Sequence, residues 1–149
     1  SNMGYVLAGR LIEAVTGKPF GDAMPELLFG PLGMKRTTFR PTMAMTWPLA
    51  QGHVETDGKL AIARPAADHA GYWPAGSMFT SGNDFSRWAI AFLNEGKLNA
   101  APVLSTSLIR AMSTPRVSIP GSVSGRAYAY GLTIDDSAGS RVIEHGGSR

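Results

Sequence analysis

Apolar residues recur every three or four positions near the N-terminus, which predicts a helix from about Gly4 to Thr16. Gly17 follows where a glycine commonly ends a helix, and Asn2 is placed to cap the start. The predicted buried face of this helix consists of Val6, Leu7, Leu11, Ile12 and Val15. A second short helix is predicted next, with Pro25 in its first turn and the GPLG stretch ending it. Its apolar positions are Phe20, Met24, Leu27 and Leu28.

The clearest helical pattern follows Ser81, which together with Asp84 three residues later resembles a capping box. This helix is predicted to end at Gly96 and to bury a stripe made of Phe85, Trp88, Ala89, Phe92 and Leu93. A shorter helix is predicted from about Ser105 to Met112, because Pro115 stops it.

Alternating apolar and polar positions predict strands in the remaining segments. Residues 52–63 predict a hairpin, because Asp57-Gly58 is a two-residue turn signal between alternating flanks. Residues 127–136 and 140–145 predict two more strands joined by a turn, and Tyr128 and Tyr130 are interpreted as packing residues on one face. Residues 64–77, which directly follow the hairpin, predict a long irregular loop. Helices, a hairpin, helices and strands in this order predict an α+β fold.

Composition places the chain among globular proteins, since 44% of its 149 residues are hydrophobic and 17% are charged. No apolar run is long enough to span a bilayer, and the absence of cysteine excludes disulfides, thiolate metal sites and a cysteine nucleophile. The net charge of +3 comes from scattered arginines, so we expect no nucleic-acid partner. We expect no cofactor and no metal site, and we interpret the candidate ligands as structural residues: His53, Asp57, His69, Asp135 and Asp136.

Five segments together carry a resemblance to a known family. They are SNMGYVLAGRLIEAVTGKPF, PLGMKRTTF, PAGSMFTSGNDFSRW, YGL and HGG, in this order and at sensible separations. The ordered set resembles the serine β-lactamase and penicillin-binding-protein family, in particular class C β-lactamases, family VIII esterases and D-aminopeptidases. The resemblance implies a β-lactamase/transpeptidase-like fold, of which residues 1–149 would be a partial domain containing the helical subdomain and edge strands of the antiparallel sheet.

The resemblance also implies an active site built from three motifs. The first, Ser-x-x-Lys with its nucleophilic serine, does not occur in this sequence, and family members place it upstream. Ser1-Asn2 fits the last two residues of the second motif, Tyr-x-Asn, and His145-Gly146-Gly147 fits the third, Lys/His-x-Gly. The chain is therefore expected to be an internal fragment that lacks the nucleophile region and the C-terminal strands and helix.

Each matching residue takes an implied role from this resemblance. Asn2 would donate its amide to the substrate or hold the family's lysine, and His145 would hydrogen-bond the motif's tyrosine or a substrate carboxylate. The backbone N–H of Ser148 would stabilise an oxyanion. The substrate would be bound by Ser1, Trp73, Gly146 and Gly147.

The resulting expectation is part of a serine hydrolase that forms an acyl-enzyme with a β-lactam, an ester or a D-amino-acid peptide. Histidine carries no permanent charge, unlike lysine, which favours an esterase or peptidase over a dedicated β-lactamase. The isolated chain is predicted to be inactive, and the alternative is a non-catalytic binding or scaffold protein. The expected partner is a small-molecule or peptide substrate. We expect a periplasmic or secreted bacterial protein rather than a cytoplasmic one. The sequence does not predict the oligomeric state.

Overall fold

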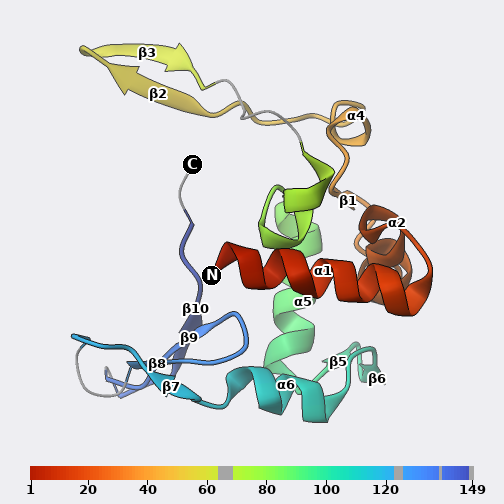
Figure 1. The fold of residues 1–149 in the computed structure, drawn as a ribbon, viewed down its shortest axis with the longest axis vertical. Helices are drawn as coiled ribbons and strands as arrows, with labels where there is room; N and C mark the ends of the chain where they lie inside the picture. The colour runs from red at the N-terminus through yellow and green to blue at the C-terminus, as the bar shows by residue number, and fades with distance from the viewer. Residues whose placement is uncertain (64–68, 123–125, 138, 148–149) are drawn as a thin grey trace. The chain divides into compact units, whose positions relative to one another are not determined.

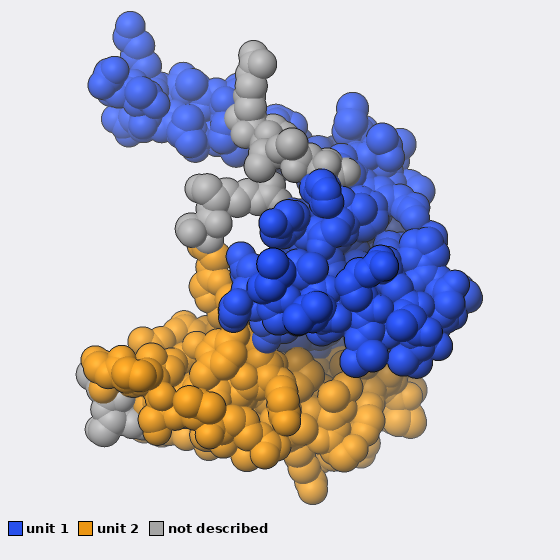
Figure 2. All heavy atoms as spheres, in the orientation of Figure 1, with its two compact units in different colours: residues 1–88 blue, residues 89–149 orange. Residues whose placement is uncertain are grey.

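A computed structural model describes residues 1–63, 69–122, 126–137 and 139–147. The chain divides into two compact units, Ser1–Trp88 and Ala89–Arg149 (Figure 2). Helices and short antiparallel strands occur together, which confirms the predicted α+β class (Figure 1). Helix α5, Gly82–Leu93, contributes residues to both units.

The first helix, α1, spans Asn2–Thr16 and confirms the N-terminal prediction (Figure 1). Ser1 occupies the N-cap position and Asn2 is already helical, so the prediction that Asn2 caps the helix is wrong. At the other end Gly17 adopts the left-handed conformation with φ 66°, as predicted, and its N–H bonds to the Glu13 carbonyl.

The buried face of α1 differs from the predicted stripe. Gly9 is its buried residue, and Val6 and Ile12 are half-buried on the same side. Leu7, Leu11 and Val15 are instead between 64% and 78% exposed. The helix uses a face centred on a glycine because that face contacts the 3-10 helix η2, Ala70–Ala75, which approaches its backbone closely.

The second helical segment is longer than predicted and changes its winding along the way. It comprises α2 (Phe20–Met24), a π-helical turn η1 (Pro25–Phe29) and α3 (Gly30–Leu32). Pro25 follows α2 instead of lying in its first turn, and it has no N–H to donate to the preceding turn. The GPLG stretch continues the helix until Gly33, where φ is 68°.

The apolar core of the first unit gathers around Phe39. The Phe20 and Phe29 ring centroids lie 5.0 Å and 5.9 Å from it. The other buried apolar residues of this unit are Ala23, Leu32, Met34 and Ala44, the last in helix α4, Pro41–Ala44. Strands β1 (Thr37–Thr38) and β4 (Phe79–Thr80) pair antiparallel beside this core.

The predicted hairpin is confirmed as strands β2 (His53–Thr56) and β3 (Lys59–Ile62). Asp57 and Gly58 have φ of 53° and 71°, the two positive values that a two-residue hairpin turn requires. All eight strand residues are exposed.

Two further predictions need correction. The predicted irregular loop contains η2 at Ala70–Ala75, while residues 64–68 of that loop lie outside the described residues. Helix α5 confirms the clearest helical prediction, but Phe85 is 50% and Leu93 77% exposed, so the predicted stripe is only partly buried. Ala91 and Phe92 are its buried apolar residues.

The second unit contains α6 (Thr106–Ser113), as predicted, with the Ser105 side chain accepting the Leu108 N–H at 3.4 Å. A small ribbon pairs β5 (Lys97–Leu98) with β6 (Ala101–Pro102). A four-stranded antiparallel sheet follows, in the order β10-β9-β8-β7. Its strands are β7 (Val117–Ser118), β8 (Arg126–Tyr128), β9 (Thr133–Asp135) and β10 (Val142–Glu144).

This sheet corrects the prediction of one strand at residues 127–136. The segment forms parts of β8 and β9, because the chain reverses at Gly131, where φ is 80°. The reversal is closed by a hydrogen bond of 2.8 Å from the Ala129 N–H to the Leu132 carbonyl. Ala129 and Ile134 are buried, so one face of the sheet is apolar.

Candidate active site

The predicted site residues fall in both units. Ser1, Asn2 and Trp73 belong to the first, and His145, Gly146 and Gly147 belong to the second. Ser148 lies outside the described residues.

The N-terminal end of α1 presents Ser1 and Asn2 to solvent. Both residues are exposed, and the Ser1 carbonyl accepts the Gly4 N–H at 3.0 Å. The Ser1 side chain forms no cap hydrogen bond.

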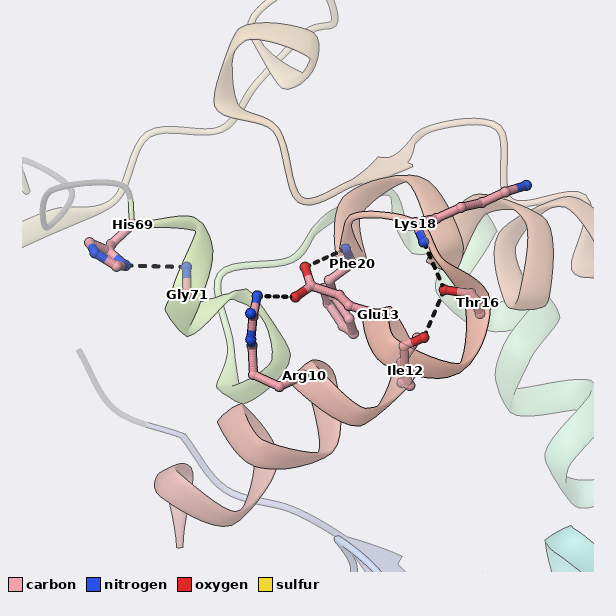
Figure 3. A network of polar contacts seen from close by, with 8 residues as sticks. All are labelled: Arg10, Ile12, Glu13, Thr16, Lys18, Phe20, His69 and Gly71. Carbon is pink, nitrogen blue, oxygen red and sulfur yellow. Dashed lines mark hydrogen bonds and ion pairs between the residues drawn. The ribbon is translucent and has the colours of Figure 1, made fainter.

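Close packing of the backbone holds α1 in place. A Cβ atom on Gly9 would lie 2.1 Å from Pro74 Cγ, so only a glycine fits here without movement. Further along the helix, Glu13 accepts the Phe20 N–H at 2.8 Å and pairs with Arg10 (Figure 3). These contacts tie α1 to η2 and α2, and thereby fix the position of Asn2 within the first unit.

Trp73 is half-buried in η2. Its ring stacks on Phe39 with centroids 6.2 Å apart and an interplanar angle of 23°. A Cβ on Gly21 would lie 2.7 Å from the Trp73 ring, which shows how closely the indole packs on α2. The ring therefore has a packing role, and its predicted contact with substrate stays a prediction.

A cavity beside the start of α5 is a feature that the sequence did not reveal. Its volume is about 500 Å³, and its lining residues are Gly33, Lys35, Arg36, Ser81, Asn83, Asp84 and Arg87. The sequence signal in this region was the capping box, of which one half is confirmed: the Asp84 N–H donates to Ser81 Oγ at 3.1 Å. The other half is wrong, because the buried Asp84 carboxylate accepts from the Arg36 N–H at 2.6 Å and the Thr37 hydroxyl at 2.9 Å.

His145 follows directly after β10, the edge strand of the sheet. Its ring is exposed, and its Nδ1 lies 2.5 Å from the Gly146 carbonyl oxygen. The Tyr128 ring meets the imidazole edge-to-face, with centroids 6.3 Å apart and an interplanar angle of 65°. Among the residues that the structure describes, none has an atom within 4 Å of a Cβ built on Gly146 or Gly147.

Charged residues bind the three strands next to His145 to one another. Arg126 on β8 reaches Glu144 on β10 at 2.5 Å, across the intervening strand β9. Arg126 Nε lies 3.2 Å from Asp135 Oδ2, but within the part of the chain that the structure describes this buried nitrogen has no hydrogen-bond partner. The Arg126–Asp135 contact is therefore an ion pair without a hydrogen bond.

Two neighbouring carboxylates, at the end of β9 and in the turn after it, have pKa values below their ordinary value. Hydrogen bonds from the Ser137 hydroxyl and N–H lower the pKa of Asp135, and Arg126 adds a smaller effect. Two hydrogen bonds of 2.8 Å from Arg141 lower the pKa of Asp136.

Among the described residues no group of three or more His, Asp or Glu side chains is arranged to hold a metal ion. In the same residues no helix is long and apolar enough to cross a membrane.

Sequence comparison matches residues 1–149 to the family described as Beta-lactamase. The chain is 28% identical to an unguisins hydrolase of Aspergillus campestris and 27% identical to the D-aminopeptidase of Brucella anthropi. Each alignment covers 99% of this chain, but only 28% and 26% of those proteins.

Among solved structures, the chain resembles the octameric penicillin-binding protein homologue from Pyrococcus abyssi, with a TM-score of 0.82 and 26% identity. This match covers 99% of the chain and 32% of that protein. The chain thus spans roughly a quarter to a third of the length of these three proteins.

Proposed function

Because the chain belongs to the beta-lactamase family, we propose that it forms part of a serine hydrolase that works through an acyl-enzyme. Its relatives include hydrolases and a D-aminopeptidase, which supports hydrolytic chemistry at the level of the family. The observation that carries the proposal is the His145-Gly146-Gly147 segment at the end of edge strand β10.

The proposed chemistry divides between this chain and residues beyond it. Since the 149 residues contain no Ser-x-x-Lys, the nucleophile would be supplied from outside the chain. The acyl-enzyme then replaces one difficult hydrolysis by two easier steps. Within the chain, Gly146 and Gly147 would let the substrate carbonyl approach the backbone, and the Ser148 N–H would donate to the developing oxyanion.

His145 and Asn2 are the polar side chains proposed to contact the substrate. Both are exposed, so neither has to be released from the protein interior before it binds. Asn2 offers an amide that donates and accepts hydrogen bonds, which suits the amide group of a peptide substrate.

We favour an amide or ester of a D-amino acid as the substrate over a β-lactam. A histidine replaces the permanent positive charge that would attract a β-lactam carboxylate. The name of the Brucella anthropi relative, D-aminopeptidase, supports the same substrate class.

The proposal is tested on a protein that carries this chain together with an upstream Ser-x-x-Lys. A serine-directed phosphonate should label it covalently, and it should hydrolyse a D-amino-acid anilide or a nitrophenyl ester faster than a chromogenic cephalosporin. His145→Ala should lower kcat/KM by about 100-fold, the usual worth of a positioned polar group. His53→Ala, which removes an exposed histidine from the hairpin, serves as the control and should leave kcat/KM unchanged.

Failure of that protein to react with the phosphonate would refute the hydrolase and leave a binding or scaffold protein. The 149-residue chain alone should show no turnover above buffer. Turnover by the chain alone would show that its own residues supply the nucleophile.

A further inference from the structure

The register of the sheet places Tyr128 and the residue before His145 on one face. Tyr128 on β8 pairs with Thr133 on β9, which pairs with Glu144 on β10. Directly opposed residues of antiparallel strands point to the same side of a sheet. His145 comes one residue after Glu144, beyond the last residue of β10, and its ring turns back to meet the Tyr128 ring.

The contact between the two rings has the geometry of a favourable aromatic pair. A centroid distance of 6.3 Å and an angle of 65° lie within the range of edge-to-face pairs. His145 is exposed and lies outside the strand, so the hydrogen-bonded ladder does not fix its side chain. The Tyr128 ring therefore restricts an imidazole that would otherwise rotate in solvent.

The second contact of the imidazole favours one of its two neutral tautomers. A carbonyl oxygen can only accept, so the 2.5 Å contact between Nδ1 and the Gly146 oxygen is a hydrogen bond when Nδ1 carries the proton. In the neutral ring Nε2 is then unprotonated and accepts. Such a nitrogen takes a proton or a hydrogen bond from a hydroxyl or an amine, and offers none to a carboxylate.

The strand that carries His145 is itself held on this face. Arg126 pairs with Glu144, the residue immediately before His145, and so links β10 to β8, the strand of Tyr128.

We propose that Tyr128 is a positioning residue that holds the His145 ring in place, while the Gly146 carbonyl favours the Nδ1–H tautomer, so that Nε2 is the atom presented to the substrate. The arrangement of the two rings stands on the geometry alone. Its importance for catalysis rests on the proposed function, in which His145 contacts the substrate.

The first test is nuclear magnetic resonance on the 149-residue chain. We expect nuclear Overhauser contacts between the Tyr128 and His145 ring protons, and nitrogen shifts of the neutral His145 ring that identify the Nδ1–H tautomer. Tyr128→Phe should preserve both signals, because it keeps the aromatic ring. Tyr128→Leu should remove the ring contacts and move the nitrogen shifts toward a mixture of tautomers.

A matched control comes from the other histidine–tyrosine pair. His69 and Tyr72 also meet edge-to-face, with centroids 5.7 Å apart. Tyr72→Leu should shift the His69 resonances and leave those of His145 unchanged. The inference is overturned if the unmodified chain shows no contacts between Tyr128 and His145, a result that does not depend on any variant folding.

Kinetics in the longer hydrolase separate this inference from the proposed function. There Tyr128→Leu should lower kcat/KM by about two- to tenfold, the range expected from the loss of one aromatic pair, and Tyr128→Phe should retain activity. If His145→Ala reduces activity but Tyr128→Leu changes neither the His145 resonances nor kcat/KM, the inference fails and the proposed function stands. If His145→Ala has no effect, the proposed role of His145 fails, and the catalytic importance of Tyr128 fails with it.

Discussion

Replacing Gly9 with alanine would put a methyl group where Pro74 already lies. The added Cβ would be 2.1 Å from Pro74 Cγ and 2.6 Å from Pro74 Cβ, far inside normal contact distance. Helix α1 or η2 must then move, and with it the contacts that fix α1 in the first unit. Gly4 lies on the same helix, and a Cβ there would have no atom within 4 Å.

The two substitutions share the same chemistry, so their difference isolates the packing at Gly9. Overfilling a packed site costs about 1–3 kcal/mol, and the short distances place Gly9→Ala at the upper end of that range. Alanine in place of glycine in a helix returns about 0.5–1 kcal/mol. We therefore expect Gly9→Ala to lower the free energy of unfolding by about 2 kcal/mol, and Gly4→Ala to raise it by about 0.5 kcal/mol.

Urea denaturation followed by circular dichroism measures both variants. A loss of about 2 kcal/mol corresponds to a decrease of about 1 M in the urea midpoint at the usual slope for small proteins. An unchanged slope would confirm that the native state alone was affected. If Gly9→Ala were as stable as the unmodified chain, or raised the midpoint as Gly4→Ala should, the close approach of α1 and η2 would be refuted.

Two further predictions concern carboxylates. Asp84→Ala removes the acceptor of one buried and one part-buried hydrogen bond, and it should lower the free energy of unfolding by about 2–4 kcal/mol. Asp22→Ala, at an exposed ion pair, should lower it by less than about 1 kcal/mol. Equal losses in denaturant titrations would contradict this prediction. Arg141 lowers the pKa of Asp136 below its ordinary value of 3.8. The charged carboxylate therefore stabilises the fold fully at pH values above 3.8, and this stabilisation is lost as the pH falls through the lowered pKa. Acid titrations of unfolding should show this loss, and Arg141→Gln should remove it.

Local signals in the sequence predicted the turns and helix ends well. The Asp57-Gly58 turn, the Gly17 helix end and the Ser81 cap depend on residues close together in the chain, and the structure confirms all three. Each follows from a requirement for positive φ or for a side-chain acceptor at a helix start.

The faces of the helices were predicted less well, because apolar spacing does not tell which neighbour a helix meets. On α1 the pattern pointed to Leu7 and Leu11, but contact with η2 selected the face of Gly9, where a small residue allows close approach. The same limit applied to Asp84, whose partners Arg36 and Thr37 lie more than forty residues away in sequence.

The candidate site shows the same contrast between features that depend on neighbouring residues and features that depend on distant ones. His145, Gly146 and Gly147 were proposed from a resemblance in short motifs, and the structure places them at the end of an edge strand. Tyr128 was interpreted as a packing residue because at strand spacing it falls on the same face as Tyr130. The turn at Gly131, which divides this segment into two strands, was not predicted. That turn sets the sheet order, which is what allows the Tyr128 ring to meet His145.

The hairpin of β2 and β3 gives the experimenter a practical handle on this protein. Its turn is formed by Asp57 and Gly58, and none of its strand residues is buried. Exposed loop tips of this kind commonly tolerate inserted sequence. An epitope or a fluorophore-binding peptide placed between these two residues would report on the protein while leaving the Phe39 core and the His145 strand intact.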